Sequence, residues 1–484
     1  MFLYIENIVT MVYAYAFWYI LSKITTPDII GISSSIISIG LILTALTSVG
    51  IPIGSQKFLG RFFQERNLED AKAMVTVSLI IVMIGILACS GFILATRAWL
   101  FNLYDFNLIA LLIILTSAST ISLLFRNIII ASLETKKLLL ASIISSGVKL
   151  FLAIILVSIG TRELGILIGF SIAPILSAIL FAFYTMSFFK GIKKKPSLKF
   201  VQSFRLLLSA SVASWIPSLI DSIGAQLGII VLLAIQGASQ AGVYYVAFQI
   251  TMGISTVIWA LYTVVFPALS AMDEGRKEFL SRSIKIGLII ILPLSSALVF
   301  ESREIMQLFG PNYIEGSFQL QVLLMSLFPT MVTVAISFLM YSYGRYKEVL
   351  MIGLAASIPR IFLYFIFITW FGNIGTAYSY IVGSIVGFIL SVVLAKRIVF
   401  TMYWKVLILI FLIPMIIAFL WSNLTLHFVP NILLSIICSY LLLLKCMIIN
   451  RSDVQACFAS LPPNIANPII GTVNKLGSVL NKNY

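Results

Sequence analysis

Long apolar runs separated by short polar segments recur along the whole chain. Each run is about 20 residues long, the length that an α-helix needs to cross about 30 Å of hydrocarbon. A transmembrane β-barrel would show short segments of alternating polarity instead, so the pattern predicts an all-α polytopic membrane protein. The first run begins at Met1 without a basic leader or a cleavage site, so we predict that it is a retained span. The fourteen predicted spans are 2–21, 29–50, 73–95, 107–130, 138–159, 164–187, 206–234, 242–267, 284–300, 318–341, 349–370, 374–395, 404–421 and 428–449.

Composition and charge support this class, because 61% of the 484 residues are hydrophobic and only 10% are charged. A soluble protein of this size would carry far more charge on its surface. With the N-terminus placed in the cytoplasm, 26 of the 32 lysines and arginines fall on the cytoplasmic side and four outside. The positive-inside rule requires such a bias, so we predict that both termini are cytoplasmic. The formal net charge of +15 then reflects topology, and no nucleic-acid partner is predicted.

The chain offers little metal or cofactor chemistry. Its four cysteines lack the paired spacing of a disulfide framework or a zinc site, and the single histidine, His427, has no cysteine or carboxylate neighbour in sequence. The sequence contains no Gly-x-x-x-x-Gly-Lys loop for a nucleotide. We therefore predict no metal, no cofactor and no direct use of ATP.

The two halves of the chain resemble each other. TKKLLLASIISSGVKLFLAI (135–154) aligns without a gap with YKEVLMIGLAASIPRIFLYF (346–365), which places Lys149 on Arg360. TPDIIGISSSIIS (26–38) resembles GASQAGVYYVAFQ (237–249), with Gly31 on Gly242. Repeats of this kind are typical of transporters whose pathway lies at the repeat interface. Because each repeat has six spans, both run through the membrane in the same direction.

The repeat predicts two six-helix lobes with two extra helices at the C-terminal end. The basic stretch KGIKKKPSLKF (190–200) fits either a contact with anionic lipid or a hinge that also sets topology. In the tail, Ile469, Val473, Leu476 and Leu480 recur at helical spacing, so an interfacial helix and a partly disordered tail both stay open. The predicted parts are an N-terminal lobe at 1–189, a basic cytoplasmic linker at 190–205, a C-terminal lobe at 206–398, an appended helix pair at 399–449 and a cytoplasmic tail at 450–484.

Five charged residues lie within or close to the predicted spans. Lipid cannot solvate a charge, so such residues face the protein interior or water and mark transport pathways. Lys149 and Arg360 occupy equivalent positions, and one cation in each half would attract an anionic substrate near the membrane centre. Asp221 could couple transport to H⁺ or Na⁺. The residues predicted to line the pathway are Lys149, Arg360, Arg126, Asp221 and Glu6.

Structural roles for these charges stay open beside the functional ones. Lys149 and Arg360 could form buried ion pairs with Glu6 or Asp221, which would join helices without touching a substrate. Asp221 could equally be the counter-ion of Arg360 or Arg126. Sequence alone does not choose between these pairings.

Several stretches together resemble a known family. LSKITTPDIIGISSSIISIGLILTALTSVGIPIGSQKFLGRFFQERNLEDAKA (21–73), FPALS (266–270) and LFGPNYIEGSFQLQVL (308–323) are similar to polysaccharide-biosynthesis flippases of the MOP exporter superfamily, and the resemblance covers about residues 1–400. It implies two six-helix lobes around a hydrophilic cavity and alternating access. The implied substrate is a polyprenyl-phosphate- or pyrophosphate-linked oligosaccharide, moved to the outer leaflet of a bacterial or archaeal cell membrane. Membrane lipids and glycan-assembly proteins are the implied partners.

Two other functions compete with this reading. A drug or metabolite antiporter of the same superfamily, coupled to H⁺ or Na⁺, would share the fold but take a small cation. The mirrored cations, Lys149 and Arg360, favour an anionic lipid instead. An enzyme that polymerises or ligates lipid-linked sugars would need a sizeable outer loop with catalytic groups, and the outer segments 96–106 and 301–317 have neither the size nor such groups. We therefore predict a transporter and no enzyme.

Overall fold

The structure is a computed structural model, and every regular element in the part of the chain that it describes is a helix. The predicted basic linker (190–205) and the predicted tail (450–484) lie largely outside that part. The alternatives given above, a lipid contact or a hinge for the linker and an interfacial helix or a disordered segment for the tail, therefore stay predictions. The described residues are 2–97, 105–190, 200–272, 274–424, 427–450, 453–455, 468, 470–471 and 473–474.

Membrane-length helices dominate the fold. Thirteen helical segments in the described ranges are long and apolar enough to cross a membrane. The first helix, α1, also has the length of a span but carries Glu6 and Asn7, which lower its hydropathy. The predicted class, an all-α polytopic protein with about fourteen transmembrane helices, is confirmed. The helices are α1 (Phe2–Ile24), α2 (Pro27–Ser48), α3 (Ile51–Gln64), α4 (Leu68–Ala95), α6 (Phe106–Ala131), α7 (Thr135–Ser158), α8 (Arg162–Phe188), α9 (Phe200–Gln236), α10 (Ala238–Ala271), α11 (Arg276–Phe300), α12 (Ser302–Phe309), the 3₁₀ helix η1 (Pro311–Gly316), α13 (Ser317–Met325), α14 (Leu327–Ser342), α15 (Tyr346–Phe371), α16 (Ile374–Arg397), α17 (Trp404–Ser422) and α18 (Phe428–Lys445).

Two predicted connecting segments are helical: 301–317 holds α12 and η1, and 51–72 holds α3. Residues 51–72 were expected to connect two spans, but α3 occupies Ile51–Gln64. Gly50 adopts φ of 68°, a left-handed conformation that suits glycine and turns the chain sharply after α2. Within α3, Leu59 is buried whereas Lys57 is exposed, so the helix is amphipathic rather than membrane-spanning.

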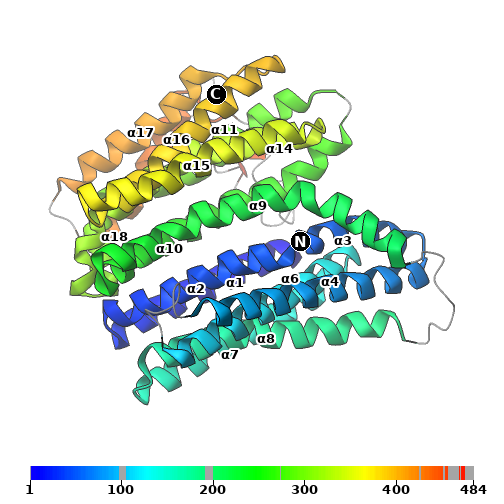
Figure 1. The fold of residues 1–484 in the computed structure, drawn as a ribbon. Coiled ribbons are helices and arrows are strands. Elements are labelled where there is room, and N and C mark those ends of the chain that lie inside the picture. Colours follow the sequence, from blue (N-terminus) through cyan, green and yellow to red (C-terminus); the bar gives the residue numbers. More distant parts are fainter. Residues whose placement is uncertain are drawn as a thin grey trace. The chain divides into compact units, whose positions relative to one another are not determined.

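One compact unit comprises Met1–Val246 and Ser357–Ser379. Within it, α7 packs against α8 and α1, α6 packs against α8 and α2, and α9 packs against α2. Figure 1 shows α7 and α8 as neighbouring helices of this unit. The buried faces bring many small residues together, as in the serine-rich face of α2, and such faces let membrane helices approach closely.

The second compact unit comprises Ala247–Ala356 and Tyr380–Tyr484. Here α11 packs against α13, α14, α17 and α18. Figure 1 labels α11 and α17, which pack together in this unit. Two polar contacts anchor its C-terminal part: Asn431 Nδ2 of α18 donates to Glu301 Oε1 at 3.2 Å, and Lys285 Nζ of α11 donates to Asp453 Oδ2 at 2.6 Å.

Two glycines that are equivalent in the sequence repeat touch each other in the first unit. A Cβ added to Gly31 of α2 would lie 1.8 Å from the carbonyl oxygen of Ala238, and one added to Gly242 of α10 would lie 2.0 Å from that of Pro27. Pro27 and Ala238 are themselves equivalent in the alignment, so the contact is reciprocal. Reciprocity is the mark of a two-fold relation between like segments, and it supports the repeat. The division into lobes at 1–189 and 206–398 stays a prediction.

Candidate functional site

Glu6 and Arg126 form an ion pair inside the first unit. Arg126 Nη2 of α6 lies 2.7 Å from Glu6 Oε2 of α1, and Ser142 Oγ of α7 donates to Glu6 Oε1 at 3.0 Å. The Glu6 side chain is 5% exposed and that of Arg126 is 33% exposed. Both carboxylate oxygens of Glu6 therefore have partners, and the cluster joins three helices. This is the arrangement of a structural ion pair.

Lys149 has a different environment. Its ammonium group lies 3.8 Å from the ring centroid of Phe170 on α8 and 4.4 Å from that of Phe17 on α1. In the part of the chain that the structure describes, Lys149 makes no ion pair. Ring faces attract a cation through their quadrupole, worth about 0.5–2 kcal/mol each, but they supply no acceptor oxygen. The hydrogen-bonding capacity of the ammonium is therefore still available for an anion.

The rings around Lys149 are held in place by packing. Phe17 is fully buried, and Trp18 meets it edge-on with the centroids 5.0 Å apart. Trp18 in turn packs edge-on against Tyr245 of α10 at 4.8 Å. Because the packing of α7 on α8 and on α1 brings these elements together, Lys149 sits on a fixed aromatic wall.

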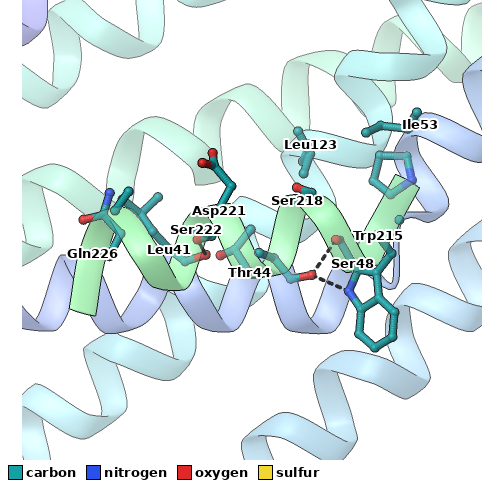
Figure 2. Close-up of a pocket in the computed structure, with 14 residues that line it drawn as sticks. Leu41, Thr44, Ser48, Ile53, Leu123, Trp215, Ser218, Asp221, Ser222 and Gln226 are labelled. Atoms are coloured by element: carbon teal, nitrogen blue, oxygen red, sulfur yellow. Dashed lines mark hydrogen bonds between the residues drawn. The ribbon is translucent and has the colours of Figure 1, made fainter. Parts of the chain in front are cut away.

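A cavity of about 420 Å³ lies between α2 and α9. Figure 2 shows Asp221, Ser218 and Ser222 on α9, with Thr44 and Ser48 on α2. Hydroxyl groups and one carboxylate therefore share a wall with apolar neighbours, which suits a ligand that carries hydroxyl groups. The lining residues are Leu41, Thr44, Ala45, Ser48, Gly50, Pro52, Ile53, Leu123, Trp215, Ser218, Asp221, Ser222, Ala225 and Gln226.

Side chains reaching to the backbone fix α9 on α2. Trp215 Nε1 donates to the carbonyl oxygen of Ala45 at 2.8 Å, as Figure 2 shows. Further along, Ser38 Oγ of α2 donates to Gln226 Oε1 of α9 at 3.0 Å. Both Trp215 and Gln226 also line the cavity, and Gln226 acts here as a link between helices.

Asp221 is exposed to the cavity and interacts electrostatically with Arg360 of α15. Arg360 itself is 5% exposed. The two helices meet closely, because Tyr364 Oη of α15 donates to the carbonyl oxygen of Gly224 at 2.9 Å. Asp221, which faces the cavity, and the buried Arg360 therefore interact with each other.

The structure thus sorts the five predicted residues into three places. Glu6 is with Arg126, Asp221 is with Arg360, and Lys149 is with aromatic rings. Neither Lys149 nor Arg360 is among the residues that line the α2–α9 cavity, so their facing one common cavity stays a prediction. The rings around Lys149 and the cavity hydroxyls of α2 were not predicted. The available signal for the hydroxyls was the spacing of Thr44 and Ser48, four residues apart on α2.

Comparisons with known proteins agree with this geometry at the level of fold. A family model described as polysaccharide biosynthesis protein matches residues 1–273. The chain is similar to the structure of the lipid II flippase MurJ in an inward closed conformation, with 18% identity, a TM-score of 0.69, and coverage of 95% of this chain and 98% of that one. Among curated proteins no sequence matches the chain.

Two further solved structures belong to transporters of the MOP superfamily. An inward-facing multidrug resistance MATE family transporter has 17% identity and a TM-score of 0.65, with coverage of 81% of this chain and 94% of that one. A transporter from Pyrococcus furiosus, whose reversed pocket polarity suggests a different function, has 16% identity and a TM-score of 0.59, covering 82% and 94%. At these identities the likeness shows the fold: that of MurJ and MATE transporters.

The contact between Glu6 and Arg126 predicts a stability defect that is repaired by a second substitution. Arg126→Gln leaves a buried carboxylate without its cation, so the midpoint of thermal unfolding in detergent should fall clearly. Removing one partner of a fully buried pair costs about 3–5 kcal/mol, and the partial exposure of Arg126 makes this an upper bound. Adding Glu6→Gln to Arg126→Gln should restore most of the loss.

The matched control is Arg61→Gln. Arg61 pairs with Glu65 on the surface of α3, where the two side chains are 76% and 49% exposed. Surface pairs contribute little, so this variant should unfold close to the wild-type midpoint. A double variant that is less stable than Arg126→Gln alone would contradict the assignment of Glu6 and Arg126 to a structural pair.

Proposed function

Because the chain belongs to the polysaccharide biosynthesis protein family, we propose that it is a flippase for a polyprenyl-(pyro)phosphate-linked oligosaccharide. It moves this lipid from the cytoplasmic to the outer leaflet by alternating access, and it carries out no enzymatic step. The likeness to MurJ and MATE structures supports a transporter of the MOP superfamily. The charges within the membrane helices support the proposed substrate class and the proposed coupling.

The observation that carries the proposal is the isolation of Lys149. Glu6 neutralises Arg126, and Asp221 lies in the field of Arg360, whereas Lys149 makes no ion pair within the described residues. A cation in hydrocarbon is costly unless an anion or water offsets it. A (pyro)phosphate group that passes α7 supplies that anion. Its oxygens accept the hydrogen bonds that the rings of Phe17 and Phe170 cannot accept.

The sugar part of the substrate needs a different surface. Hydroxyl-bearing side chains of α2 and α9, among them Thr44, Ser48 and Ser218, line the cavity beside Asp221. Such groups exchange hydrogen bonds with sugar hydroxyls as readily as with water, so they favour passage without tight binding. We assign the phosphate to Lys149 and the sugar to this hydroxylated wall.

A drug or metabolite antiporter coupled to H⁺ or Na⁺ is the second candidate function. The carboxylate of Asp221 in the α2–α9 cavity favours it, because an acid attracts a cationic substrate. The two functions make opposite demands on Lys149, since a cationic substrate is repelled by that residue. Neutralising Lys149 should therefore impair a flippase and leave an antiporter intact or improved.

We predict that Lys149→Gln cuts flipping at least tenfold, because a charge-assisted hydrogen bond is worth about 1.5–3 kcal/mol. Lys149→Arg should retain most activity, because it keeps the charge. The measurement is flipping of a fluorescent polyprenyl-pyrophosphate-linked disaccharide in proteoliposomes, divided by the amount of folded protein.

Lys137→Gln is the matched control for Lys149→Gln. Lys137 lies on the same helix, α7, but pairs with Glu134 at 2.6 Å near the start of that helix. Its loss should leave flipping near wild type. A well-folded Lys149→Gln protein that flips the lipid at the wild-type rate would end the assignment of Lys149 to the phosphate.

We further propose that Asp221 couples transport to H⁺ or Na⁺. While its carboxylate is charged it offsets the field of Arg360, and a bound proton or Na⁺ cancels that effect. Arg360 then attracts the substrate phosphate more strongly, so ion loading and substrate loading are linked. We propose on this basis that both Asp221 and Arg360 belong to the same pathway as Lys149.

Asp221→Asn tests this coupling because it keeps the shape of the side chain and removes its charge. Flipping should continue but should no longer respond to an imposed H⁺ or Na⁺ gradient. Ser222→Ala, on the same cavity wall, is the control and should keep the gradient response. If the Asp221→Asn protein still responds to the gradient as the wild type does, Asp221 is not the coupling residue.

We also propose that the protein lies in the cell membrane of a bacterium or archaeon with both termini in the cytoplasm. The excess of lysine and arginine in alternate loops supports this orientation. A reporter that fluoresces only in the cytoplasm should be bright when fused after Tyr484 and dark when inserted in segment 301–317. The reverse pattern would invert the topology. Glycan-assembly proteins remain proposed partners at the cytoplasmic loops.

A further inference from the structure

A second cavity, of about 310 Å³, lies in the second unit where α11 and α17 begin. Two basic residues of α11, Arg282 and Lys285, line it together with Tyr403 and with Asp453 from the segment that follows α18. This cavity shares no residue with the α2–α9 cavity. Its remaining lining residues are Glu278, Ser281, Ile284, Met402, Val406 and Leu407.

One carboxylate occupies the space between the two cations. Lys285 Nζ donates to Asp453 Oδ2 at 2.6 Å, and Arg282 Nε lies 3.6 Å from Asp453 Oδ1. The backbone N–H of Asn450 also donates to Asp453 Oδ2, at 3.0 Å. Asp453 is 4% exposed. The segment after α18 is thus tied to α11 by one buried acid.

The donors that surround Asp453 match a phosphate group better than a single carboxylate. The ammonium group of Lys285 and the guanidinium group of Arg282 both face the carboxylate of Asp453. Glu278, the other acid of the cavity, is exposed one turn before Arg282. Phosphate offers more acceptor oxygens than a carboxylate, and Arg and Lys are the side chains that proteins use to hold it.

The surroundings of the cavity favour a phosphate that carries acyl chains. Met402, Val406 and Leu407 form an apolar wall, and Tyr403 is 75% exposed beside it. Ile408 of the next turn of α17 is also exposed. Aromatic residues at the ends of apolar helices mark the headgroup level of a membrane, and basic pockets at that level hold anionic headgroups. A soluble anion would gain nothing from the apolar wall.

We propose that this cavity binds the phosphate of an anionic glycerophospholipid, which displaces Asp453 from Arg282 and Lys285. Acyl chains of the lipid lie along the exposed apolar side chains of α17. Binding releases Asp453 from α11, so the lipid and the carboxylate compete for the same two cations. This site is independent of the proposed flippase function.

The test uses the full chain in phosphatidylcholine nanodiscs, titrated with phosphatidylglycerol and followed by native mass spectrometry. Neutralising Asp453 and neutralising either basic residue should change the affinity for phosphatidylglycerol in opposite directions. Asp453→Asn should tighten phosphatidylglycerol binding about fivefold, whereas Lys285→Gln and Arg282→Gln should each weaken it about fivefold, the usual effect of one basic residue near a lipid surface. A misfolded protein would not bind phosphatidylglycerol more tightly, so misfolding cannot explain tighter binding by Asp453→Asn.

Lys277→Gln is the matched control, because Lys277 lies in the first turn of α11 but outside the cavity. It should bind phosphatidylglycerol like the wild type. In the wild type, the amide of Asn450 should exchange its hydrogen faster after phosphatidylglycerol is added, since its bond to Asp453 is lost. Equal binding in Lys285→Gln and in the wild type would overturn the proposal.

Inorganic phosphate and a polyprenyl pyrophosphate distinguish the possible sources of the phosphate group. Neither compound at the concentration of the bound phosphatidylglycerol should displace it if the cavity is a phospholipid site. Displacement by inorganic phosphate would identify a soluble anion as the ligand, and displacement by the polyprenyl pyrophosphate would identify the lipid-linked class. Either result would overturn the assignment to a membrane phospholipid.

Discussion

The cost of placing a charge in hydrocarbon governs how this protein arranges its polar groups. Membrane lipid offers neither water nor counter-ions, so a charge within a span needs a partner in the protein, access to water or a passing ligand. Glu6 meets this requirement through Arg126 and Ser142, and both of its oxygens are satisfied. Asp221 meets it through exposure to a cavity and through the field of Arg360. Lys149 meets it only in part, through the faces of Phe17 and Phe170.

Close packing of small residues makes these arrangements possible. Water does not drive membrane helices together, so contact depends on shape and on hydrogen bonds. At the crossing of α2 and α10 the backbone atoms of Gly31 and Gly242 approach each other so closely that neither position has room for a side chain. Helix α9 packs against α2, which is rich in buried serines, and the cavity that is lined by Asp221 lies along this contact. Close helix packing and the polar wall of the cavity therefore use the same helix, α2.

Much of the fold followed from hydropathy, because the membrane imposes one length on every span. The predicted span 374–395 is α16, Ile374–Arg397, and the predicted span 404–421 is α17, Trp404–Ser422. The amphipathic α3 was missed because Lys57 and Arg61 interrupt its apolar residues, although those residues recur at helical spacing. A prediction based only on the length of apolar runs assigns such a short amphipathic helix to a loop.

The candidate site could be predicted only as a set of residues. A charge within a span is visible in the sequence, so Glu6, Arg126, Lys149, Asp221 and Arg360 could be named as candidates. Their pairing was not, because Glu6 and Arg126 are 120 residues apart and several partners were chemically equivalent. The ring faces over Lys149 carry no signal at all in a chain with 35 phenylalanines. Contacts between distant helices decide which charge is neutralised within the protein.

We propose above all that the ammonium group of Lys149 receives the phosphate of the substrate. Solid-state NMR tests this contact directly, by measuring magnetisation transfer between ¹⁵N in lysine side chains and ³¹P in a bound polyprenyl-pyrophosphate-linked sugar. A hydrogen bond of about 2.8 Å places nitrogen and phosphorus about 4 Å apart, so we expect strong transfer in the wild type. The transfer should vanish in Lys149→Arg, which keeps the charge but lacks the labelled nitrogen. Transfer that persists in Lys149→Arg, or that is absent from the wild type with substrate bound, would show that Lys149 does not hold the phosphate.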